Sequence, residues 1–425
     1  MATKEKKILM IVAAYPPEPI VTANISRDVA IKINKDEFSV EVWCPFPNRP
    51  EGKIHESYKK KAFLSSESRD GVRVKRFRAF VSKRSTLLSR GLENLSFGII
   101  STVFLLLNRR VDCVYLNTWP IISTGMLSSV LKLRGIPYIV HVQDLYPEGL
   151  VVQNNRIKNS VLWKFSQSVD NFVCRYAAHC IFLSERMLSL VRARTKTFDT
   201  PSTIVPNWGT LSLDHDRGQE GDSLRLSLNI PSGDFVMLYA GNVSRASGIL
   251  SMVQMFALLP SMKNFHFLIA GSGSELDACR EVVERNKLSF VKFHSPWLPS
   301  EQAIILHCAD AFLLPTVKGQ SIVSVPSKLI SYLLAARPIL AICEEQSQLA
   351  DVIDESGSGI RCDPGDNYGI YTAIIKMQCL SANFRVAMGQ SGRRYAIKKF
   401  GSNRNSKIIV NLLKSIVDGG VNFQA

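Results

Sequence analysis

The chain has 425 residues, of which 46% are hydrophobic and 21% are charged, and its formal net charge is +16. This length suggests two or three domains of roughly 150 residues each, and the composition excludes a disordered chain. The positive excess indicates an anionic partner such as nucleic acid, lipid or a phosphorylated substrate. Between residues 53 and 110, fourteen Lys and Arg occur with only four Asp and Glu. A solvated basic face is the alternative interpretation of that stretch.

The N-terminal apolar run, Ile8–Ala14, ends at Tyr15-Pro16-Pro17 and lacks a small-residue cleavage site, so we expect a buried strand rather than a signal peptide. The apolar stretch Leu95–Leu107 is shorter than the ~20 residues that span a bilayer. Nine scattered cysteines form no C-x-x-C pair and no Cys/His metal spacing, which fits a reducing compartment. The chain is therefore predicted to be soluble or peripheral.

Short apolar runs alternate with helical patterns along the chain, and the pattern starts a second time after Asn207. The first series predicts strands at Ile8–Ala14, Val40–Cys44, Val72–Phe77, Asp112–Asn117, Tyr138–Val142, Cys180–Ser184 and Thr203–Pro206, with helices such as Thr22–Asn34, Leu87–Leu107 and Val161–Ala178. The second series predicts strands at Val236–Tyr239, Phe265–Ala270, Phe290–Phe293, Ala311–Pro315, Pro338–Ile342 and Gly359–Cys362.

Strands that are apolar on both faces and are followed by helices indicate a parallel sheet covered on both sides. The sequence therefore predicts an α/β fold of two Rossmann-like, doubly wound domains that face a central cleft. The expected domains are residues 1–206 and 207–399, with a polar linker at Ser212–Gly233 that includes Asp214 and Asp216. A final helix within residues 400–425 has no strand after it and is expected to pack back on the first domain.

Two predicted strands of the second domain end in glycine, at Gly241-Asn242 and at Gly271-Ser272-Gly273. Glycine after a strand permits a tight turn and a close approach of phosphate to the backbone. Arg245 would add a charge-assisted contact. For either loop by itself an ordinary strand-to-helix turn is the preferred interpretation, but two such loops in adjacent units favour a nucleotide site. Neither matches G-x-G-x-x-G or a P-loop.

A third element, Ser324 to Tyr332, opens a helix after the predicted strand Ala311–Pro315. Pro326 suits a first helical turn, and Ser327 is expected to cap it. A lysine at a helix start opposes the helix dipole unless an anion binds there. Lys328 is therefore a candidate phosphate ligand, and a solvent-facing lysine is the alternative.

The segment Pro326-Ser327-Lys328-Leu329, with Tyr332-Leu333 and Ala335-Ala336-Arg337-Pro338, resembles the signature helix of family-four glycosyltransferases of the GT-B fold. Further similar segments occur in the same order, at Tyr15-Pro16-Pro17-Glu18, Val140 to Glu148, Val205-Pro206-Asn207, Tyr239-Ala240-Gly241-Asn242 and Ile269 to Gly273. The resemblance covers nearly the whole chain and is closest to bacterial O-antigen and capsule enzymes. Two glutamates that are common in the family are replaced here by Val323 and Ser331.

The resemblance implies where ligands contact the chain. Candidates for the catalytic groups are His141, Asp144, Arg245 and Lys328. Candidates for the donor site are Gly241, Asn242, Arg245, Gly271, Gly273, Pro296, Trp297, Ser327, Lys328 and Ser331. Candidates for the acceptor side are Pro17, Glu18, Thr22, His141 and Asp144. From the residues alone, His141 is equally interpreted as a core histidine and Asp144 as a turn carboxylate.

The same resemblance implies sugar transfer with retention of configuration and without metal or cofactor, from a nucleotide-diphosphate sugar that we expect to be UDP-linked. It also implies a polyprenyl-diphosphate-linked saccharide as acceptor, at the cytoplasmic face of the cell membrane. The basic stretch beside Leu95–Leu107 suits an anionic membrane surface, although a core helix is the preferred interpretation of Leu95–Leu107 itself. A nucleotide-sugar epimerase of the same fold remains an alternative. A nucleic-acid-binding protein is disfavoured, since the basic stretch lacks interleaved aromatic residues.

Overall fold

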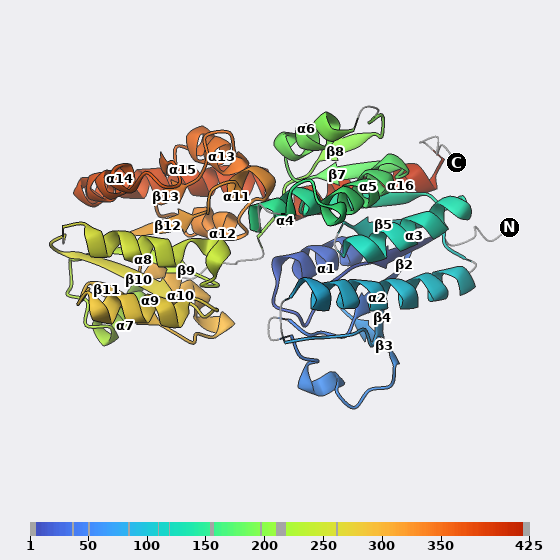
Figure 1. The fold of residues 1–425 in the computed structure, drawn as a ribbon, viewed down its shortest axis with the longest axis horizontal. Coiled ribbons are helices and arrows are strands. Elements are labelled where there is room, and N and C mark those ends of the chain that lie inside the picture. Colours follow the sequence, from blue (N-terminus) through green and yellow to red (C-terminus); the bar gives the residue numbers. More distant parts are fainter. Residues whose placement is uncertain are drawn as a thin grey trace. The chain divides into compact units, whose positions relative to one another are not determined.

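The computed structural model describes residues 6–35, 38–49, 52–83, 86–108, 110–118, 120–153, 157–195, 198–209, 218–260 and 262–419. It divides into two compact units, each built on a parallel sheet (Figure 1). The first unit contains residues 1–210 and 402–425, and the second contains residues 211–401. Asp214 and Asp216 of the predicted linker lie outside the described residues.

The described strands of the first unit form an eight-stranded sheet in the order β3-β4-β2-β1-β5-β6-β7-β8. All neighbouring strands are parallel except β3, which runs antiparallel to β4 at the edge. Their bounds are β1 Lys7–Ile11, β2 Ser39–Pro45, β3 Leu64–Arg69, β4 Val72–Phe77, β5 Cys113–Asn117, β6 Tyr138–Val142, β7 His179–Phe182 and β8 Ser202–Ile204.

Side chains that alternate along the first sheet form two separate cores. Leu9 and Ile11 pack into a cluster with α2, α3 and α5, whereas Ile8 and Met10 pack into a cluster with α1 and α16. This period of two is the geometry of a strand that is covered on both faces. The helices of this unit are α1 Val21–Asn34, α2 Leu87–Leu107, α3 Ile121–Leu133, α4 Tyr146–Gln153, α5 Val161–Arg175, α6 Glu185–Arg194 and α16 Ser402–Val417, with a short 3-10 turn at Glu56–Tyr58.

The C-terminal helix α16 belongs to the first unit and packs on α1. Its apolar face supplies Ile409, Val410, Leu413 and Ile416 to the same core as Ile25. Asp28 on α1 accepts hydrogen bonds from Trp208 Nε1 and Ser402 Oγ, both at 2.8 Å. One carboxylate thus fixes the chain where it leaves the first unit and where it returns.

The second unit has a six-stranded, fully parallel sheet in the order β11-β10-β9-β12-β13-β14. Its strands are β9 Phe235–Ala240, β10 Phe265–Ala270, β11 Val291–His294, β12 Ala311–Pro315, β13 Ile339–Ile342 and β14 Gly359–Cys362. Its helices are α7 Gly218–Ser227, α8 Ile249–Leu258, α9 Leu276–Arg285, α10 Gln302–His307, α11 Gln320–Val323, α12 Lys328–Leu334, α13 Gln348–Ser356, α14 Asn367–Cys379 and α15 Ala382–Lys399, with 3-10 turns at Arg245–Ser247 and Pro299–Glu301. Helices α8, α9 and α14 pack on one face, and α10, α12, α13 and α15 on the other.

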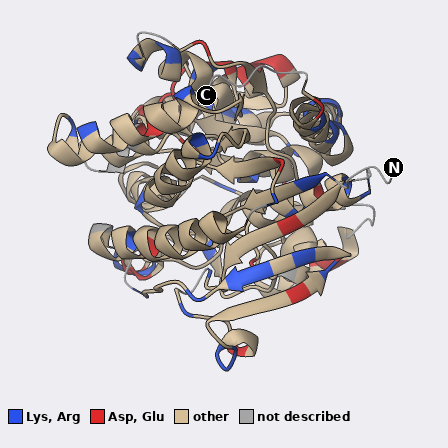
Figure 2. Cartoon of the chain, turned by 90° about the vertical axis from the view of Figure 1, so that its right-hand side faces the viewer, with Lys and Arg blue, Asp and Glu red and all other residues tan. Residues whose placement is uncertain are grey.

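The predicted fold class, two doubly wound α/β domains with parallel sheets, is confirmed. The edge strand β3 was not predicted, because its sequence Leu64-Ser-Ser-Glu-Ser-Arg69 is polar on both faces and gives no apolar signal. Much of the basic stretch is also paired with carboxylates within the first unit, on strands where Figure 2 shows Lys, Arg, Asp and Glu together. Lys75 pairs with Glu41 at 2.7 Å, and the fully buried Arg76 pairs with Glu67 at 2.8 Å.

Candidate functional site

The loops after β9 and β10 are joined to each other by their backbones. Gly241 N donates to Ala270 O at 2.8 Å, and Val243 N donates to Ser272 O at 2.9 Å. Glu275 N, just before α9, donates back to Val243 O at 3.1 Å. Since β9 and β10 are parallel neighbours, both loops lie at the carboxyl edge of the sheet, where ligands of open α/β sheets bind.

The glycines in these loops permit a close approach of the two chains. A Cβ on Gly271, which has φ +155°, would lie 1.9 Å from Gly241 O. The N–H groups of Gly241 and Gly271 already donate to Ala270 O and His294 O. These two amides are therefore used within the protein, and the glycines shape the site rather than donate to a ligand.

Helix α12 places Lys328 over the first of these loops. Tyr332 is one helical turn after Lys328, so both side chains lie on the same face of α12. The Tyr332 hydroxyl accepts a hydrogen bond from Ala240 N at 2.8 Å, and its ring stacks on Phe312 with centroids 4.2 Å apart. This anchor fixes α12 against the end of β9 and the side of β12, so the Lys328 side chain extends across Gly241.

The Lys328 ammonium lies in a partly buried and electrically unbalanced position. A Cβ on Gly241 would lie 2.0 Å from Lys328 Cε and 2.9 Å from Nζ, so only glycine leaves room for this side chain. Nζ is 5.1 Å from the centre of the Tyr239 ring, a cation–π contact. Burial lowers the Lys328 pKa, and within the described ranges this ammonium has no hydrogen-bonded or ion-paired carboxylate. An anionic ligand would supply the missing negative charge.

The loop between β12 and α11 is held by a carboxylate that sequence reasoning missed. Glu344, two residues after β13, accepts hydrogen bonds from Gly319 N and Ser321 Oγ. Its own N–H donates to Ser321 Oγ at 3.1 Å. A glutamate just beyond a buried strand was the available signal, since the carboxyl ends of parallel strands meet at one edge of the sheet.

Arg245 and Asn242 lie on the exposed part of the first loop. Arg245 begins the 3-10 turn Arg245–Ser247, whose start is closed by reciprocal hydrogen bonds between Ser244 and Ser247. In the portion of the chain that the structure describes, the Arg245 guanidinium makes no ion pair. Because Arg245 is exposed, an ion pair that it formed with an anion would be weaker than one formed by the partly buried Lys328.

Ser327 does not cap α12 as expected, because its backbone is helical and its side chain makes no cap hydrogen bond. Ser331 is half-buried within the same helix. The remaining donor candidates follow β11, where Pro296 is exposed and Trp297 packs on the core beneath α12. The His294 carbonyl accepts from Gly271 N at 3.1 Å, so the end of β11 adjoins the second glycine loop.

On the first unit, the acceptor-side candidates follow β1. The Glu18 side chain is buried, and its Oε1 accepts from Asn48 N at 3.0 Å and Arg49 N at 3.2 Å. Burial raises the pKa of Glu18, although the two hydrogen bonds favour the ionised carboxylate and act to lower that pKa. This carboxylate therefore holds the loop after β2, while Pro17 is exposed and Thr22 lies half-buried in the first turn of α1.

His141 lies within β6 and Asp144 lies two residues beyond the end of that strand, and the two side chains differ in environment. His141 is fully buried, its Nδ1 is 2.6 Å from the Tyr115 hydroxyl, and burial lowers its pKa to about 3. Its Nε2 has no hydrogen-bond partner among the described residues. Asp144 keeps an exposed surface, yet the protein around its carboxyl raises its pKa to about 6. The structure thus gives His141 the neutral, enclosed position of a core histidine, whereas part of Asp144 reaches the surface.

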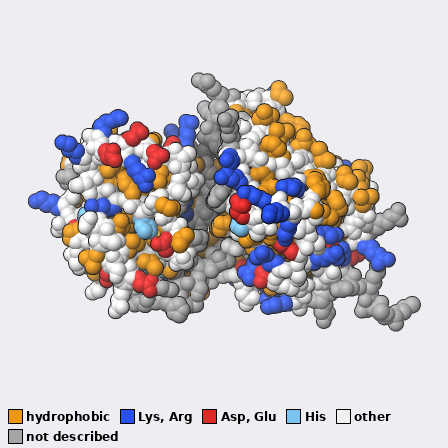
Figure 3. All heavy atoms as spheres, turned by 90° about the horizontal axis from the view of Figure 1, so that it is seen from below, with side chains coloured by type: hydrophobic (Ala, Val, Ile, Leu, Met, Phe, Trp, Pro, Cys, Tyr) orange, Lys and Arg blue, Asp and Glu red, His pale blue; other side chains and the backbone are white. Residues whose placement is uncertain are grey.

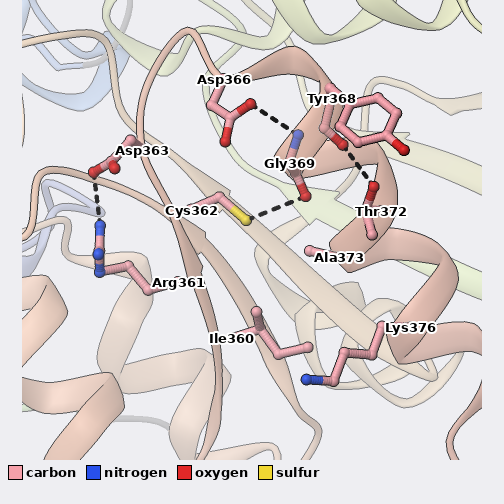
Figure 4. Close-up of a pocket in the computed structure, with 10 residues that line it drawn as sticks. All are labelled: Ile360, Arg361, Cys362, Asp363, Asp366, Tyr368, Gly369, Thr372, Ala373 and Lys376. Carbon is pink, nitrogen blue, oxygen red and sulfur yellow. Dashed lines mark hydrogen bonds and ion pairs between the residues drawn. The ribbon is translucent and has the colours of Figure 1, made fainter.

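A separate open groove of about 400 Å³ lies between β14 and the start of α14 (Figure 4). Its polar groups mostly serve local structure: Asp366 Oδ1 caps α14 by accepting from Gly369 N at 2.9 Å, and Arg361 pairs with Asp363 at 2.7 Å. None of the predicted site residues lines it. The lining residues are Ile360, Arg361, Cys362, Asp363, Asp366, Tyr368, Gly369, Thr372, Ala373 and Lys376.

Comparisons with known proteins agree with the division of the chain into two units. Residues 24–208 match the family described as Glycosyl transferase 4-like domain, and residues 234–378 match Glycosyl transferases group 1. The chain is 25% identical to the probable glycosyltransferase WbjE of Pseudomonas aeruginosa over 289 residues, which cover 67% of this chain and 71% of WbjE. It is 21% identical over 356 residues to the putative colanic acid biosynthesis glycosyl transferase WcaI of Escherichia coli, covering 82% of this chain and 86% of WcaI.

The fold is similar to the crystal structure of Anabaena Alr3699/HepE in complex with UDP and glucose, with a TM-score of 0.70 and 14% identity over 97% of this chain and 100% of that one. The expectation of the GT-B fold is confirmed. The chain therefore contains a glycosyl transferase 4-like domain followed by a glycosyl transferases group 1 domain, and both matches support a glycosyltransferase.

Proposed function

We propose that the chain transfers a hexosyl or N-acetylhexosaminyl group, with retention of configuration and without metal, from a UDP-sugar to a polyprenyl-diphosphate-linked saccharide. The product would enter a bacterial surface polysaccharide such as O-antigen or capsule, and the enzyme would act at the cytoplasmic face of the cell membrane as a peripheral protein. Support comes from the matched domains and from the names of WbjE and WcaI. UDP in the similar HepE structure supports the choice of nucleotide.

The observation that carries the proposal is the Lys328 ammonium. It is partly buried, it lies over Gly241 at the carboxyl edge of the sheet, and it lacks a carboxylate partner in the described part of the chain. A buried charge without a counter-charge is costly, and a diphosphate would remove that cost. In this proposal Lys328 and Arg245 contact the donor diphosphate, and the loops at Gly241, Gly271 and Gly273 shape its site.

The chemical step follows from where charge develops. As the bond between the sugar and the diphosphate lengthens, negative charge grows on the leaving phosphate oxygen, and Lys328 stabilises that oxygen. The acceptor hydroxyl attacks from the same side, and its proton passes to the departing phosphate. In this proposal Asp144 contacts the transferred sugar or the acceptor. His141 holds the end of β6 through Tyr115 and would reach a ligand only through its unpartnered Nε2.

A thermal-shift series with UDP, GDP and ADP tests the donor site. We expect UDP to raise the melting temperature of the wild type and of Lys376→Ala, a matched lysine variant in the groove of Figure 4. We expect Lys328→Ala to lose most of that shift. Loss of the shift in Lys376→Ala with retention in Lys328→Ala would assign the nucleotide to the groove instead.

Two further measurements test the reaction. Incubation of the enzyme with the UDP-sugar in the absence of acceptor should leave the sugar unchanged, whereas an epimerase would convert it. Incubation with EDTA should leave the rate of transfer in the presence of acceptor unchanged if the reaction needs no metal. A rate that collapses in EDTA and returns with a divalent ion would contradict metal independence.

A further inference from the structure

The side of α2 that faces away from the sheet is apolar and exposed over its whole length. Its side chains are spaced by three or four residues, as expected for one face of a helix. Each is between 41% and 75% exposed. We call this set the outer face of α2; its members are Leu88, Leu92, Leu95, Ile99, Val103, Leu106 and Leu107.

The opposite side of the same helix is part of the core of the first unit. Phe97 and Leu105 are buried against the sheet. Ser101 is also buried, and its hydroxyl donates a hydrogen bond to Phe97 O. Arg134 closes the C-terminal end by donating to Leu105 O at 2.5 Å and Asn108 O at 2.9 Å. The preferred expectation of a core helix is therefore correct for one side of α2 and wrong for the other.

Among the described helices, α2 is long and apolar enough to cross a membrane by length and composition. Crossing would remove Phe97 and Leu105 from the core and would expose the backbone end that Arg134 caps. A position in the plane of a membrane surface keeps both in place. An amphipathic helix in that position buries its apolar face at the boundary between headgroups and acyl chains.

Charge lies around the outer face and not within it. The last charged residue of α2 is Glu93, which pairs with Arg49 at 3.1 Å. The chain from Ala79 to Lys83 is attached to α2 by a hydrogen bond from Phe80 N to Ser96 Oγ at 2.9 Å, and Phe80 is itself exposed. Figure 3 shows hydrophobic side chains gathered on the first unit beside a group of Lys and Arg. Exposed cations on the segments before α2 include Lys53, Lys60, Arg78 and Lys83.

From this arrangement we infer that the outer face of α2, with Phe80, inserts into the surface of an anionic lipid bilayer while Lys53, Lys60 and Lys83 contact lipid phosphates. The inference rests on the proposed function, since a polyprenyl-linked acceptor lies in such a membrane. A second copy of the chain is a poorer occupant, because two-fold pairing of this face would bring like charges together on a chain of net charge +16. The bilayer offers an apolar layer bordered by negative charge.

Vesicle flotation of the full chain tests the inference. The vesicles contain either phosphatidylcholine alone or phosphatidylcholine with phosphatidylglycerol, each at low and high salt. The test variant is Leu95→Gln with Ile99→Gln and Val103→Gln. The control carries three changes of the same kind at exposed apolar positions of α15, Phe384→Gln, Val386→Gln and Ile397→Gln. We expect the α2 variant to bind anionic vesicles at least tenfold more weakly and the control to bind within twofold of wild type.

A second variant tests the charges. Lys60→Ala with Lys83→Ala should lower binding to anionic vesicles roughly tenfold or more and should weaken its salt dependence. The inference is overturned if the α2 variant floats like wild type, or if binding is equal on both kinds of vesicle. It is also overturned if the wild type is a dimer that the α2 changes convert to a monomer, because the face would then be an interface between copies.

The UDP thermal shift of each variant separates this inference from the proposed function. Loss of flotation with an unchanged UDP shift and an unchanged melting temperature supports the membrane face. Normal flotation of a wild-type protein that shows no nucleotide shift would support the membrane face and contradict only the donor site.

Discussion

Replacing Lys328 by alanine should cut the rate of sugar transfer by 10²- to 10³-fold. An ammonium about 4 Å from a phosphate oxygen is worth about 4 kcal/mol at an effective dielectric constant of about 20. Lys328 is partly buried and has no carboxylate partner in the described residues, so its charge is little compensated within the protein. Because each ~1.4 kcal/mol of transition-state stabilisation is a factor of ten in rate, losing most of this energy gives the stated range.

The assay is the initial rate of UDP release at saturating and subsaturating donor, with the melting temperature of each variant as a check on folding. Lys328→Arg keeps the charge but has to fit a larger group over Gly241, so it should recover only part of the rate. Lys376→Ala serves as the matched control in the same unit. A folded Lys328→Ala protein with kcat/KM within threefold of wild type would refute the assignment of Lys328 to the donor diphosphate.

Three further predictions concern stability and pH. Gly271→Ala should destabilise the second unit by about 3 kcal/mol, since the new Cβ would meet the Gly241 carbonyl oxygen at 1.9 Å and alanine disfavours φ +155°. The thermal transition of the second unit measures this loss. A Cβ on Gly149 would have no neighbour within 4 Å, so Gly149→Ala should stay near wild type. His141 has a folded-state pKa of about 3, below the ordinary 6.5, so folding stability is fully present above pH 6.5 and falls as the pH decreases. Between pH 7.5 and 4.5 the free energy of unfolding should fall by about 2.5 kcal/mol more in wild type than in His141→Asn, and equal pH slopes in urea titrations would argue against a buried neutral histidine. Asp144 has its pKa raised to about 6, so if its carboxylate contacts the substrate, kcat/KM should rise as the pH increases through 6, and this rise should be absent in Asp144→Asn.

The sequence alone determined the layer structure of both domains. Buried parallel strands are short, mostly apolar runs, and this pattern gave β6, β10 and β12 with the bounds that the structure shows. The bounds predicted for β4 and β14 match the structure as well. The edge strand β3 was missed because its sequence is polar on both faces and carries no apolar pattern. The glycines after β9 and β10 were also recognisable, because only glycine permits the close approach between these loops.

What each candidate side chain does was decided by tertiary contacts. Glu18 looked like an acceptor ligand, but two amide groups of the loop after β2 bind its carboxylate. The apolar run in α2 was interpreted as core, yet only one side of that helix meets the sheet, since its helical period turns the other side outward.

For Lys328 as well, the place along the chain was visible in the sequence, whereas the environment of the side chain was decided by the tertiary structure. The sequence placed it at a helix start after a buried strand, where an anion was a reasonable expectation. Its position over Gly241 depends on Tyr332, which bonds to Ala240 more than ninety residues earlier in the chain. A local pattern contains the residue and its spacing, whereas the direction and burial of a side chain depend on distant segments that come together only when the sheet forms.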